Sequence, residues 1–311
     1  DHDSLAHWNH PRWWIDLLCK DHPSHWEQIL RANNAHAPMT LRVNPQKTTV
    51  ADYLSALNAI DLGATQLGGT GIALQQPVPV QRLPGFDQGW VSVQDAAAQR
   101  AAPLLLQGMD LSKPLRVLDA CAAPGGKTAH LLELAGVNAA LEVTALEIDA
   151  ARSARIHETL ERLGLQAKVL IADASRPQDW WQQQCGGVAF DAILLDAPCT
   201  ASGIVRRHPD VRWLRRETDI AQLAALQARL LKALWPLVKT GGRLLYCTCS
   251  VFRAEGDRQV QTFLAHHTDA RLLASPGHLI PGGTDKGQSV PDNPDSDHDG
   301  FFYALFEKPL R

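Results

Sequence analysis

The sequence predicts an α/β protein whose core is a mostly parallel sheet with helical crossovers. From about Val91 onward, short apolar runs alternate with amphipathic segments, which is the pattern of strands joined by helices. Successive apolar runs also end in an acidic residue, and a later run ends in cysteines. Ligands of open α/β sheets bind at the carboxyl ends of the strands, so this placement predicts a site along one sheet edge.

The expected strands of this region span residues 115–118, 143–146, 169–172, 192–195 and 243–246. The first four are followed at once by Asp119, Glu147, Asp173 and Asp196, and the fifth leads to Cys249. Residues 128–134 and 219–239 are predicted to be helices, the second because its leucines recur on one stripe.

The first ninety residues predict two smaller parts. Residues 1–37 are expected to form short helices, because Trp13, Trp14, Leu17 and Leu18 recur at helical spacing after Pro11. Residues 38–90 are expected to form a small α/β unit, with strands at 39–44 and 72–74, a helix at 50–60 and a glycine turn at 68–71. Residues 91–311 then form the main domain.

The composition is that of an ordinary globular protein, with 45% hydrophobic and 20% charged residues among 311. No apolar run reaches the roughly 18 residues of a membrane span, and the start has no signal pattern, so we expect a cytoplasmic protein without a membrane partner. Six cysteines without a secretory signal favour free thiols over a disulfide framework. Because Asp1 stands where an initiator Met is expected, we expect a fragment of a longer chain.

The turn from Asp119 to Thr128 is the strongest local signal. It is glycine-rich and lies between a strand and a helix, so its backbone N–H groups can approach a ligand closely. A phosphate-binding P-loop is excluded because Cys121 stands where the first glycine is required, and the dinucleotide motif G-x-G-x-x-G is absent as well. A tight turn without a ligand is the alternative, and the acidic ends of the following strands argue against it.

The later strand ends predict further contacts. Glu147 is placed to accept hydrogen bonds from ribose hydroxyls, and Asp173 is placed for the adenine side of the same ligand. Asp196 precedes Pro198 and Cys199, which brings a carboxyl group and a thiol to one turn, and Cys249 is expected on the neighbouring strand end. Each cysteine taken alone is more often a buried structural residue, and a disulfide or a C-x-C metal site remains an alternative.

A basic segment, residues 204–216, follows the Asp-Ala-Pro-Cys turn. Arg206, Arg207, Arg212 and Arg215 accompany Trp213, and arginines for phosphates with an aromatic ring for stacking predict an RNA-contacting surface. The net charge of −3 argues weakly against nucleic acid, but local basic groups decide such binding. The alternative is a charged loop that pairs with acids of its own segment.

These motifs closely resemble those of the RNA cytosine-C5 methyltransferase family, over nearly the whole chain. The resemblance rests on residues 119–128, 196–199 and 248–250. It implies a Rossmann-like class I methyltransferase domain with a mixed, mostly parallel sheet, preceded by a small α/β RNA-recognition-like subdomain and short N-terminal helices. Residues 10–13, 206–210 and 299–302 resemble the members that methylate small-subunit (16S) ribosomal RNA. Those members begin with a helical RNA-binding domain, which we expect this chain to lack, and we expect a monomer.

The resemblance also implies the cofactor and the roles of the site residues. The cofactor is S-adenosylmethionine, and the residues implied to bind it are Cys121, Ala122, Ala123, Pro124, Gly125, Gly126, Lys127, Glu147, Asp173 and Asp196. Cys249 is implied as the nucleophile that attacks C6 of cytosine and Cys199 as the residue of the release stage, with Asp196 and Lys127 assisting. The alternatives are a related enzyme acting on transfer RNA and a non-catalytic RNA-binding module.

Two further patterns are expected to be without function. Residues 295–300 match the opening of a calcium loop, but Phe306 stands where the bidentate Glu is required, so we expect a solvated loop. The N-terminal histidines (2, 7, 10, 22, 25 and 36) are irregularly spaced. No metal is therefore expected.

Overall fold

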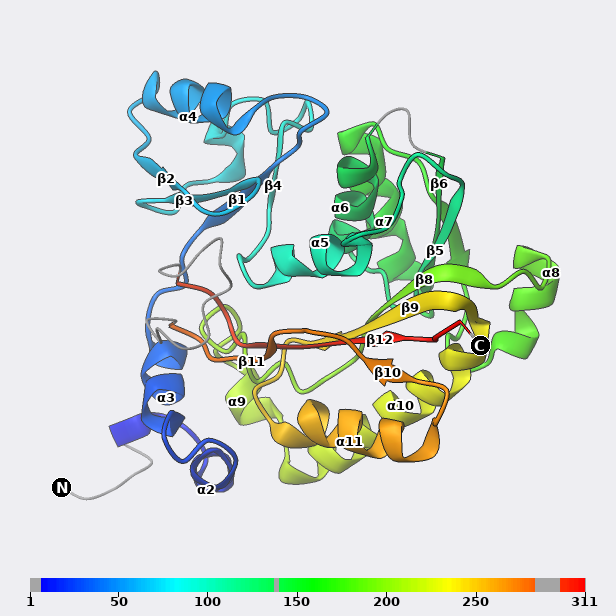
Figure 1. Cartoon of the computed structure of the whole chain (residues 1–311). Helices are drawn as coiled ribbons and strands as arrows, with labels where there is room; N and C mark the ends of the chain where they lie inside the picture. The colour runs from blue at the N-terminus through cyan, green and yellow to red at the C-terminus, as the bar shows by residue number, and fades with distance from the viewer. Residues whose placement is uncertain (1–6, 137–139, 283–296, 311) are drawn as a thin grey trace.

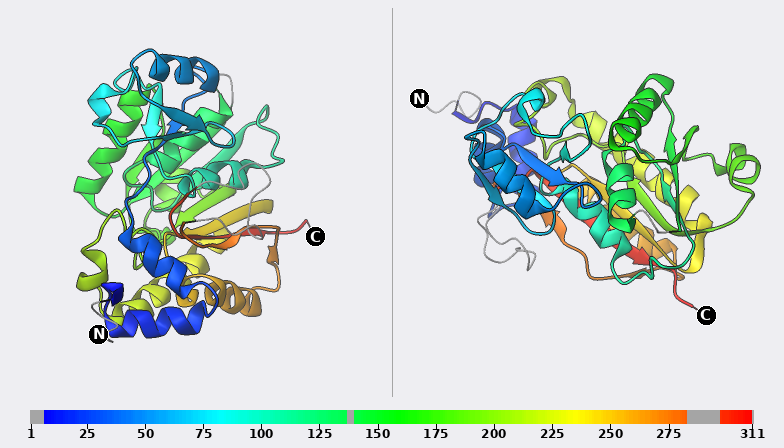
Figure 2. Two further views of the ribbon diagram at one scale, coloured as in Figure 1. Left: turned by 90° about the vertical axis from the view of Figure 1, so that its left-hand side faces the viewer. Right: turned by 90° about the horizontal axis from the view of Figure 1, so that it is seen from above.

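The computed structural model describes residues 7–136, 140–282 and 297–310. Its elements form a large mixed sheet with helices on both faces, a small antiparallel sheet and a pair of N-terminal helices (Figure 1). In the left view of Figure 2, the small sheet lies at the top and the N-terminal helices at the bottom, and the blue segment that follows these helices leads up to the small sheet.

The large sheet has the strand order β10-β12-β9-β8-β5-β6-β7, with β11 paired to β12. The strands β5 to β9 pair with one another in parallel, whereas β12 runs antiparallel to β9. The parallel strands are β5 (Leu115–Asp119), β6 (Leu141–Glu147), β7 (Lys168–Ile171), β8 (Phe190–Asp196) and β9 (Val238–Thr248). The antiparallel strands are β10 (Arg271–Leu272), β11 (Gly277–Leu279) and β12 (Phe301–Glu307). The predicted mixed, mostly parallel sheet is confirmed.

Helices cover both faces of this sheet because its central strands are apolar on both sides. Helices α10 (Glu217–Leu234) and α11 (Asp257–His266) pack on one face, where Leu230, Leu234 and Phe263 share a buried cluster with Ile193 and Leu244. On the opposite face lie α5 (Ala101–Leu106), α6 (Gly126–Ala135) and α7 (Ala150–Leu163). The sheet is thus enclosed except at its edges and strand ends.

One predicted helix is too long. The stretch 219–239 was expected to be helical throughout, but α10 ends at Leu234 and a short 3-10 turn, Trp235–Leu237, follows it. Pro236 lies in that turn and cannot continue a regular helix, and β9 begins at Val238.

The small sheet has the order β2-β3-β1-β4, with every neighbouring pair antiparallel. Its strands are β1 (Thr40–Val43), β2 (Ala64–Gln66), β3 (Gly71–Leu74) and β4 (Val91–Val93), and helix α4 (Val50–Asn58) packs against it. Strands β2 and β4 were not predicted. Because β4 pairs with β1, the small sheet extends to Val93, beyond the predicted end of this unit at Trp90.

A buried ion pair joins the small sheet to the main domain. Arg42 of β1 donates to both carboxylate oxygens of Glu133 on α6, at 2.8 and 2.9 Å, and also to the carbonyl oxygen of Gly126 at 3.0 Å. Both charged side chains are almost fully covered. The start of α6 is therefore fixed from the small sheet.

The N-terminal helices α2 (Arg12–Asp21) and α3 (Trp26–Asn34) pack on the main domain. Trp14, Leu18 and Ile29 share a buried cluster with Phe252, which follows β9, and with Ile220 of α10. Short helices α8 (Trp181–Cys185) and α9 (Val211–Leu214) complete the described elements. None of the helices in the described ranges is both long and apolar enough to cross a membrane.

Candidate active site

The carboxyl ends of four parallel strands bring most of the expected site residues to one edge. Strands β5, β6 and β8 end at Asp119, Glu147 and Asp196, and Cys249 follows the last residue of β9. Strand β7 ends at Ile171, two residues before Asp173. The expected edge placement is therefore what the fold produces.

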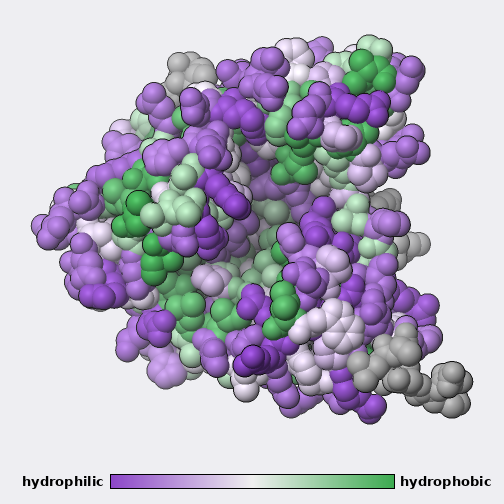
Figure 3. All heavy atoms as spheres, turned by 180° about the vertical axis from the view of Figure 1, so that it is seen from behind, coloured by the Kyte–Doolittle hydropathy of each residue, from purple (hydrophilic) through white to green (hydrophobic). Residues whose placement is uncertain are grey.

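A cavity of about 270 Å³ lies at this edge. Its lining includes seven of the predicted site residues: Cys121, Ala123, Glu147, Asp173, Asp196, Cys199 and Cys249. Ala122, Pro124, Gly125, Gly126 and Lys127 belong to the same turn but are not part of the cavity lining. Seen from behind, the molecule is hollowed near its centre, and hydrophobic side chains are visible inside the hollow (Figure 3).

The turn between β5 and α6 is tightly built. Gly125 has φ +99°, and a Cβ atom there would lie 3.2 Å from the Cα of Ile156, so both the backbone conformation and the space require glycine. Asp119 is fully buried and accepts a hydrogen bond from the Thr128 hydroxyl at 2.6 Å through Oδ2. Its Oδ1 has no hydrogen-bond partner in the described part of the chain. Burial raises the pKa of Asp119 to about 6.

Lys127 and Asp196 form an ion pair beside the cavity, with Nζ 2.6 Å from Oδ2. The exposed fractions of the two side chains are 14% and 28%, so water screens the pair only in part. Burial opposes the charge of Lys127, but Asp196 outweighs it and raises the pKa of the ammonium group. Cys247 also donates to Oδ1 of Asp196 at 3.5 Å. Asp196 is therefore held in one orientation by two neighbours.

The two predicted thiols meet, with the Sγ atoms of Cys199 and Cys249 3.4 Å apart. The hydrogen bond to Cys249 and burial together raise the pKa of Cys199 well above its ordinary value, with further contributions from the charges of Cys249 and Glu255. Cys199 thus stays a thiol at neutral pH and can donate its S–H to Cys249. All six cysteines are free, as expected.

Comparison with known protein families identifies the family of this chain. The sequence profile described as 16S rRNA methyltransferase RsmB/F matches residues 107–307, which is more than half of the chain. The chain belongs to the RsmB/F family of 16S rRNA methyltransferases. A second profile, described as an RsmF/B-like ferredoxin-like domain, matches residues 10–81. The resemblance inferred from the motifs is confirmed at the level of this family.

Curated relatives that share one name align with nearly all of the chain. Ribosomal RNA small subunit methyltransferase B of Vibrio cholerae is 45% identical, covering 99% of this chain and 67% of the relative. The protein of that name from Serratia proteamaculans is 46% identical, covering 96% of this chain and 66% of the relative. The chain therefore spans about two thirds of the length of these RsmB/F relatives.

Solved structures agree on the fold. A methyltransferase homolog from Pyrococcus horikoshii superimposes with a TM-score of 0.78 at 26% identity, covering 98% of this chain and 97% of its own. NSun6 from the same organism, described as crystallised with SFG, gives a TM-score of 0.76 at 18% identity, covering 97% of this chain and 99% of its own. The predicted Rossmann-like methyltransferase fold is confirmed.

S-adenosylmethionine is the expected cofactor of a methyltransferase of this family, and the strand-end edge fits it. The unpartnered, buried Oδ1 of Asp119 is an acceptor for a donor group of a ligand. Glu147, only 3% exposed, accepts from the backbone N–H of Asp149 and has Arg152 at 3.6 Å, which leaves acceptor capacity for hydroxyl groups. The residues present thus offer hydrogen-bond acceptors for a ligand that carries ribose hydroxyl groups and an ammonium group.

Two of the arginines expected to contact RNA are engaged within the protein. Arg206 pairs with the fully buried Asp299 at 2.6 Å and with Asp297 at 2.7 Å, and only 2% of its side chain is exposed. Arg207 pairs with Asp299 and, at 2.9 Å, with Asp95. The expected phosphate contact is wrong for Arg206, because its guanidinium is enclosed between acids that lie far along the chain.

The other two arginines also bind within the protein. Arg212 is buried and donates to the carbonyl oxygens of Pro209 and Asn9 and to Oδ1 of Asn34, so it joins α9 to the N-terminal helices instead of facing phosphates. Arg215 donates to the carbonyl oxygens of Thr200 and Cys199 at 3.2 and 3.3 Å.

The expected solvated loop at 295–300 is also revised. Residues 295 and 296 lie outside the described ranges, whereas His298, Asp299 and Gly300 are buried. Gly300 donates its N–H to the carbonyl oxygen of Gly203, and a Cβ atom at Gly203 would lie 2.0 Å from the oxygen of Gly300. This segment therefore packs on the loop that follows Cys199. No group of three or more potential metal ligands occurs among the described residues.

One residue near the cysteines was missed. Glu255 is fully buried and accepts hydrogen bonds from Thr200, Ser250 and Gln227, each next to or packed on a cysteine turn. Its place six residues after Cys249 gave no signal, because only the tertiary fold brings it back beneath both turns.

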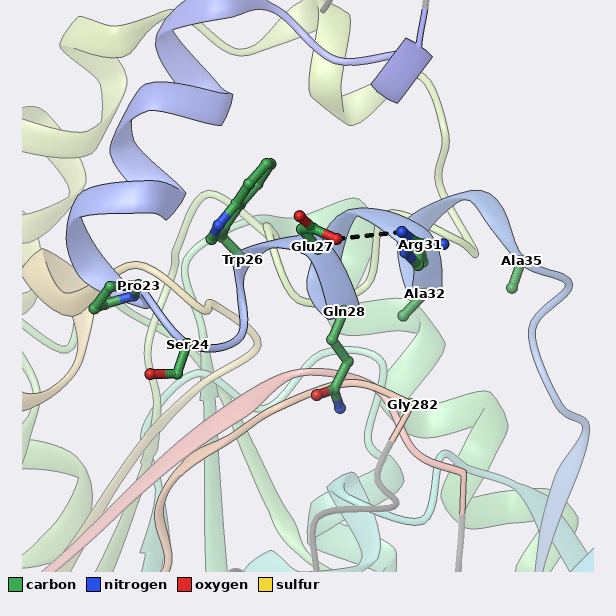
Figure 4. A pocket seen from close by; sticks show the side chains of 9 residues that line it. All are labelled: Pro23, Ser24, Trp26, Glu27, Gln28, Arg31, Ala32, Ala35 and Gly282. Atoms are coloured by element: carbon green, nitrogen blue, oxygen red, sulfur yellow. Dashed lines mark hydrogen bonds and ion pairs between the residues drawn. The ribbon is translucent and has the colours of Figure 1, made fainter.

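A larger cavity, about 620 Å³, lies away from this chemistry against α3 (Figure 4). Glu27 and Arg31, which form an ion pair at 3.2 Å on one helix turn, are the charged groups on its walls. Its lining residues are Pro23, Ser24, Trp26, Glu27, Gln28, Arg31, Ala32, Ala35 and Gly282. It contains no pair of groups suited to methyl transfer.

Proposed function

We propose that the protein transfers a methyl group from S-adenosylmethionine to C5 of a cytosine in RNA, with 16S ribosomal RNA as the substrate. The contact between Cys199 and Cys249 beside Asp196 carries the proposal. A methyltransferase that alkylates an exocyclic nitrogen or an oxygen has no need of two thiols in its pocket. A reaction at a carbon that is a poor nucleophile does need one.

Cys249 supplies the missing nucleophilicity of C5. Its thiolate adds to C6 of the base, which makes C5 enamine-like and able to attack an electrophile. S-adenosylmethionine, when bound, supplies the electrophilic methyl group. After transfer, a base accepts the C5 proton, the C5–H electron pair forms the C5–C6 double bond, and the electron pair of the C6–S bond returns to the sulfur of Cys249. Cys199, in contact with that sulfur, serves this release stage.

Asp196 and Lys127 act on the polar edge of the same base. The Asp196 carboxylate accepts a hydrogen bond from the N4 amino group at the N3/N4 edge of the cytosine, which orients the base for addition of the thiolate to C6. Lys127 fixes that carboxylate through the ion pair at 2.6 Å. Lys127 contacts Oδ2 of Asp196. The other oxygen, Oδ1, is contacted by the weak donor Cys247 at 3.5 Å, so it can also accept a hydrogen bond from the base.

The cofactor is proposed to lie across the remaining strand ends. Its contacts come from the turn 121–127 and from Glu147, Asp173 and Asp196. Glu147 accepts from the ribose hydroxyls, and Asp173 lies toward the adenine ring. Asp119 adds a buried acceptor beneath the turn.

The RNA must present its target base unstacked, because the cavity admits a base only after it has left the helix. We propose that residues 1–37 and the small unit predicted at 38–90, which β4 extends to Val93, face the RNA, and that the remainder of 91–311 is the catalytic domain. On α9, Trp213 and Leu214 are 53% and 71% exposed, beside the Arg215 contact to the Cys199 turn. The Trp213 ring is suited to stack on a nucleotide that flanks the target.

Bisulfite sequencing tests this proposal. Unmodified 16S rRNA and bulk transfer RNA are incubated separately with the protein and S-adenosylmethionine, with Cys249→Ala as the control. The proposal predicts one protected cytosine in 16S rRNA that is absent with the variant. Protection found only in transfer RNA contradicts the substrate, and transfer of radiolabelled methyl groups without any protected cytosine contradicts the C5 reaction.

A further inference from the structure

Glu255 lies beneath the two cysteine turns and receives four hydrogen bonds. It belongs to the 3-10 turn Arg253–Glu255 after β9 and is fully buried. Its Oε1 accepts from the backbone N–H of Thr200 at 2.9 Å and from Nε2 of Gln227 at 3.0 Å. Its Oε2 accepts from the hydroxyl groups of Thr200 at 2.5 Å and Ser250 at 2.6 Å.

Two of the donor residues are the sequence neighbours of the two cysteines. Thr200 follows Cys199 and Ser250 follows Cys249, so a single carboxylate connects the turn after β8 to the turn after β9. Gln227 of α10 also donates to the carbonyl oxygen of Pro198 at 2.8 Å. Both turns are thus fixed to the same two oxygen atoms.

The backbone of Glu255 is fixed as well. Its carbonyl oxygen accepts from the hydroxyl group of Tyr246 at 2.7 Å and from that of Thr248 at 3.2 Å. Both donors lie on β9, directly before Cys249. The carboxylate therefore cannot shift without moving the strand that carries the nucleophile.

The charge of Glu255 is held without a cation. No Lys or Arg forms an ion pair with Glu255 within the ranges that the structure describes, and four hydrogen bonds stabilise its carboxylate instead. A buried charge balanced by hydrogen bonds alone is unfavourable for folding, and such groups concentrate at functional sites. Burial accordingly raises the pKa of Glu255, against the effect of these hydrogen bonds.

We propose that Glu255 is a positioning residue of the cysteine pair: it ties the turn after β8 to the turn after β9 and so holds the two sulfur atoms in contact, with its negative charge close to the Cys199 thiol. This inference rests on the proposed function for its meaning in the reaction. The pKa of Cys199 agrees with it, because the hydrogen bond to Cys249, burial and then the charges of Cys249 and Glu255 all raise that pKa.

The contact gives Cys199 a defined part in the reaction. A neutral thiol 3.4 Å away stabilises the thiolate of Cys249 before it attacks C6, and again as the C6–S bond breaks and the electron pair returns to sulfur. No proton changes owner in this contact. Cys199 then acts as a hydrogen-bond donor to the leaving thiolate.

Two substitutions separate geometry from charge. In Glu255→Gln, the amide oxygen can keep the two N–H donors, while the amide NH₂ donates to the hydroxyl groups of Thr200 and Ser250, which can also accept. The turns stay tied but the charge is lost. In Glu255→Ala, both are lost. Asp191→Asn is the matched control, because Asp191 is a partly buried carboxylate near the opposite end of β8 that accepts from Lys239 and from the backbone N–H of Arg116.

The deciding readout is the iodoacetamide alkylation of Cys199 and Cys249 between pH 6 and 10, resolved by peptide mass spectrometry. We expect Cys199 to be alkylated at lower pH in both Glu255 variants, and its alkylation profile to be unchanged in Asp191→Asn. We also expect Glu255→Ala to slow single-turnover methylation about 100-fold, as misplaced reacting groups do, and Glu255→Gln to restore about tenfold of that loss.

An alkylation profile identical to that of the wild type in both variants overturns the proposal, whatever happens to turnover, because it reduces Glu255 to a structural residue. If Glu255→Ala does not fold, the profile of Glu255→Gln decides alone. If the wild type methylates no cytosine, the proposed function fails, whereas the alkylation profiles still decide whether Glu255 controls the pair.

Discussion

The Lys127 ammonium group lies 2.6 Å from the Asp196 carboxylate, at the point where the cofactor turn meets the turn that carries Cys199. The pair joins the start of α6 to the end of β8, so it connects the two halves of the site. Asp196 thereby acquires a fixed orientation toward the cavity that Cys249 also lines.

Asp196→Asn is expected to reduce the rate of methyl transfer about 10²-fold, because the carboxylate that orients the base by accepting from its amino group is lost. Lys127→Met is expected to give a similar loss, since the Asp196 carboxylate is then free to turn away from the base. Single-turnover assays at saturating RNA measure both. Lys239→Met is the control: it breaks an ion pair of 2.7 Å with Asp191 that is distant from the cavity. Equal losses in all three variants would contradict the assignment.

Glu147→Ala is expected to weaken binding of S-adenosylmethionine about 10- to 100-fold, because hydrogen bonds to a carboxylate contribute about 1.5–3 kcal/mol. Calorimetry measures the affinity directly. Glu142→Ala is the matched control, since Glu142 lies on the same strand with its side chain 78% exposed. Unchanged affinity in Glu147→Ala would contradict the proposed position of the ribose.

Asp119→Asn is expected to stabilise the protein at neutral pH. Burial raises the pKa of Asp119 from 3.8 to about 6, with Asp196 adding to the effect and the Thr128 hydrogen bond and Lys127 opposing it. An acid whose pKa is raised by folding binds its proton more tightly in the folded state. Its stabilising contribution is therefore present below about pH 4 and is lost as the pH rises through about 6.

The Asn variant should not show this pH-dependent loss of stability. Its free energy of unfolding at pH 7 should exceed that of the wild type by on the order of 1–3 kcal/mol. Denaturant unfolding between pH 4.5 and 8 checks the prediction, and cofactor affinity should fall in the same variant. A variant that is less stable than the wild type at pH 7 would show that Asp119 is a structural residue.

Arg206→Ala is expected to lower the free energy of unfolding by about 3 kcal/mol, because the buried Asp299 then keeps only one of its two arginine partners, Arg207. Arg271→Ala, which breaks a surface pair with Glu307, should cost about 1 kcal/mol or less. Chemical unfolding measures both. If Arg206→Ala keeps its stability but reduces the salt dependence of RNA binding, the original assignment of Arg206 to phosphates is restored.

The sequence predicted the edge and its acids because strand ends, glycine turns and amphipathic stripes are local patterns. The contacts of Arg206 and Arg212 could not be predicted, since Asp299 lies 93 positions along the chain from Arg206 and Asn9 lies 203 from Arg212. A run of arginines gives the same local signal whether it faces water or buried acids. The sequence therefore indicated charge in this loop without indicating its partner.

Short elements were missed for a similar reason. Strands β2 and β4 have three residues each, too few to show alternation, and they exist because β3 and β1 pair with them. Glu255 lies in a 3-10 turn of three residues and shows no periodicity of its own. Long-range packing, which single-sequence patterns do not contain, decides all three.

The central claim is that Cys249 forms a covalent bond to the base and that Cys199 acts in its release. Denaturing gel electrophoresis of variants incubated with RNA and S-adenosylmethionine tests it most directly, with Cys185→Ala, a buried cysteine that does not line the cavity, as the control. Cys199→Ala should accumulate a protein–RNA complex that survives denaturation and contains a methylated cytosine, whereas Cys249→Ala should form none and be inactive. A complex trapped by Cys249→Ala instead, or two active variants that trap nothing, would contradict the account.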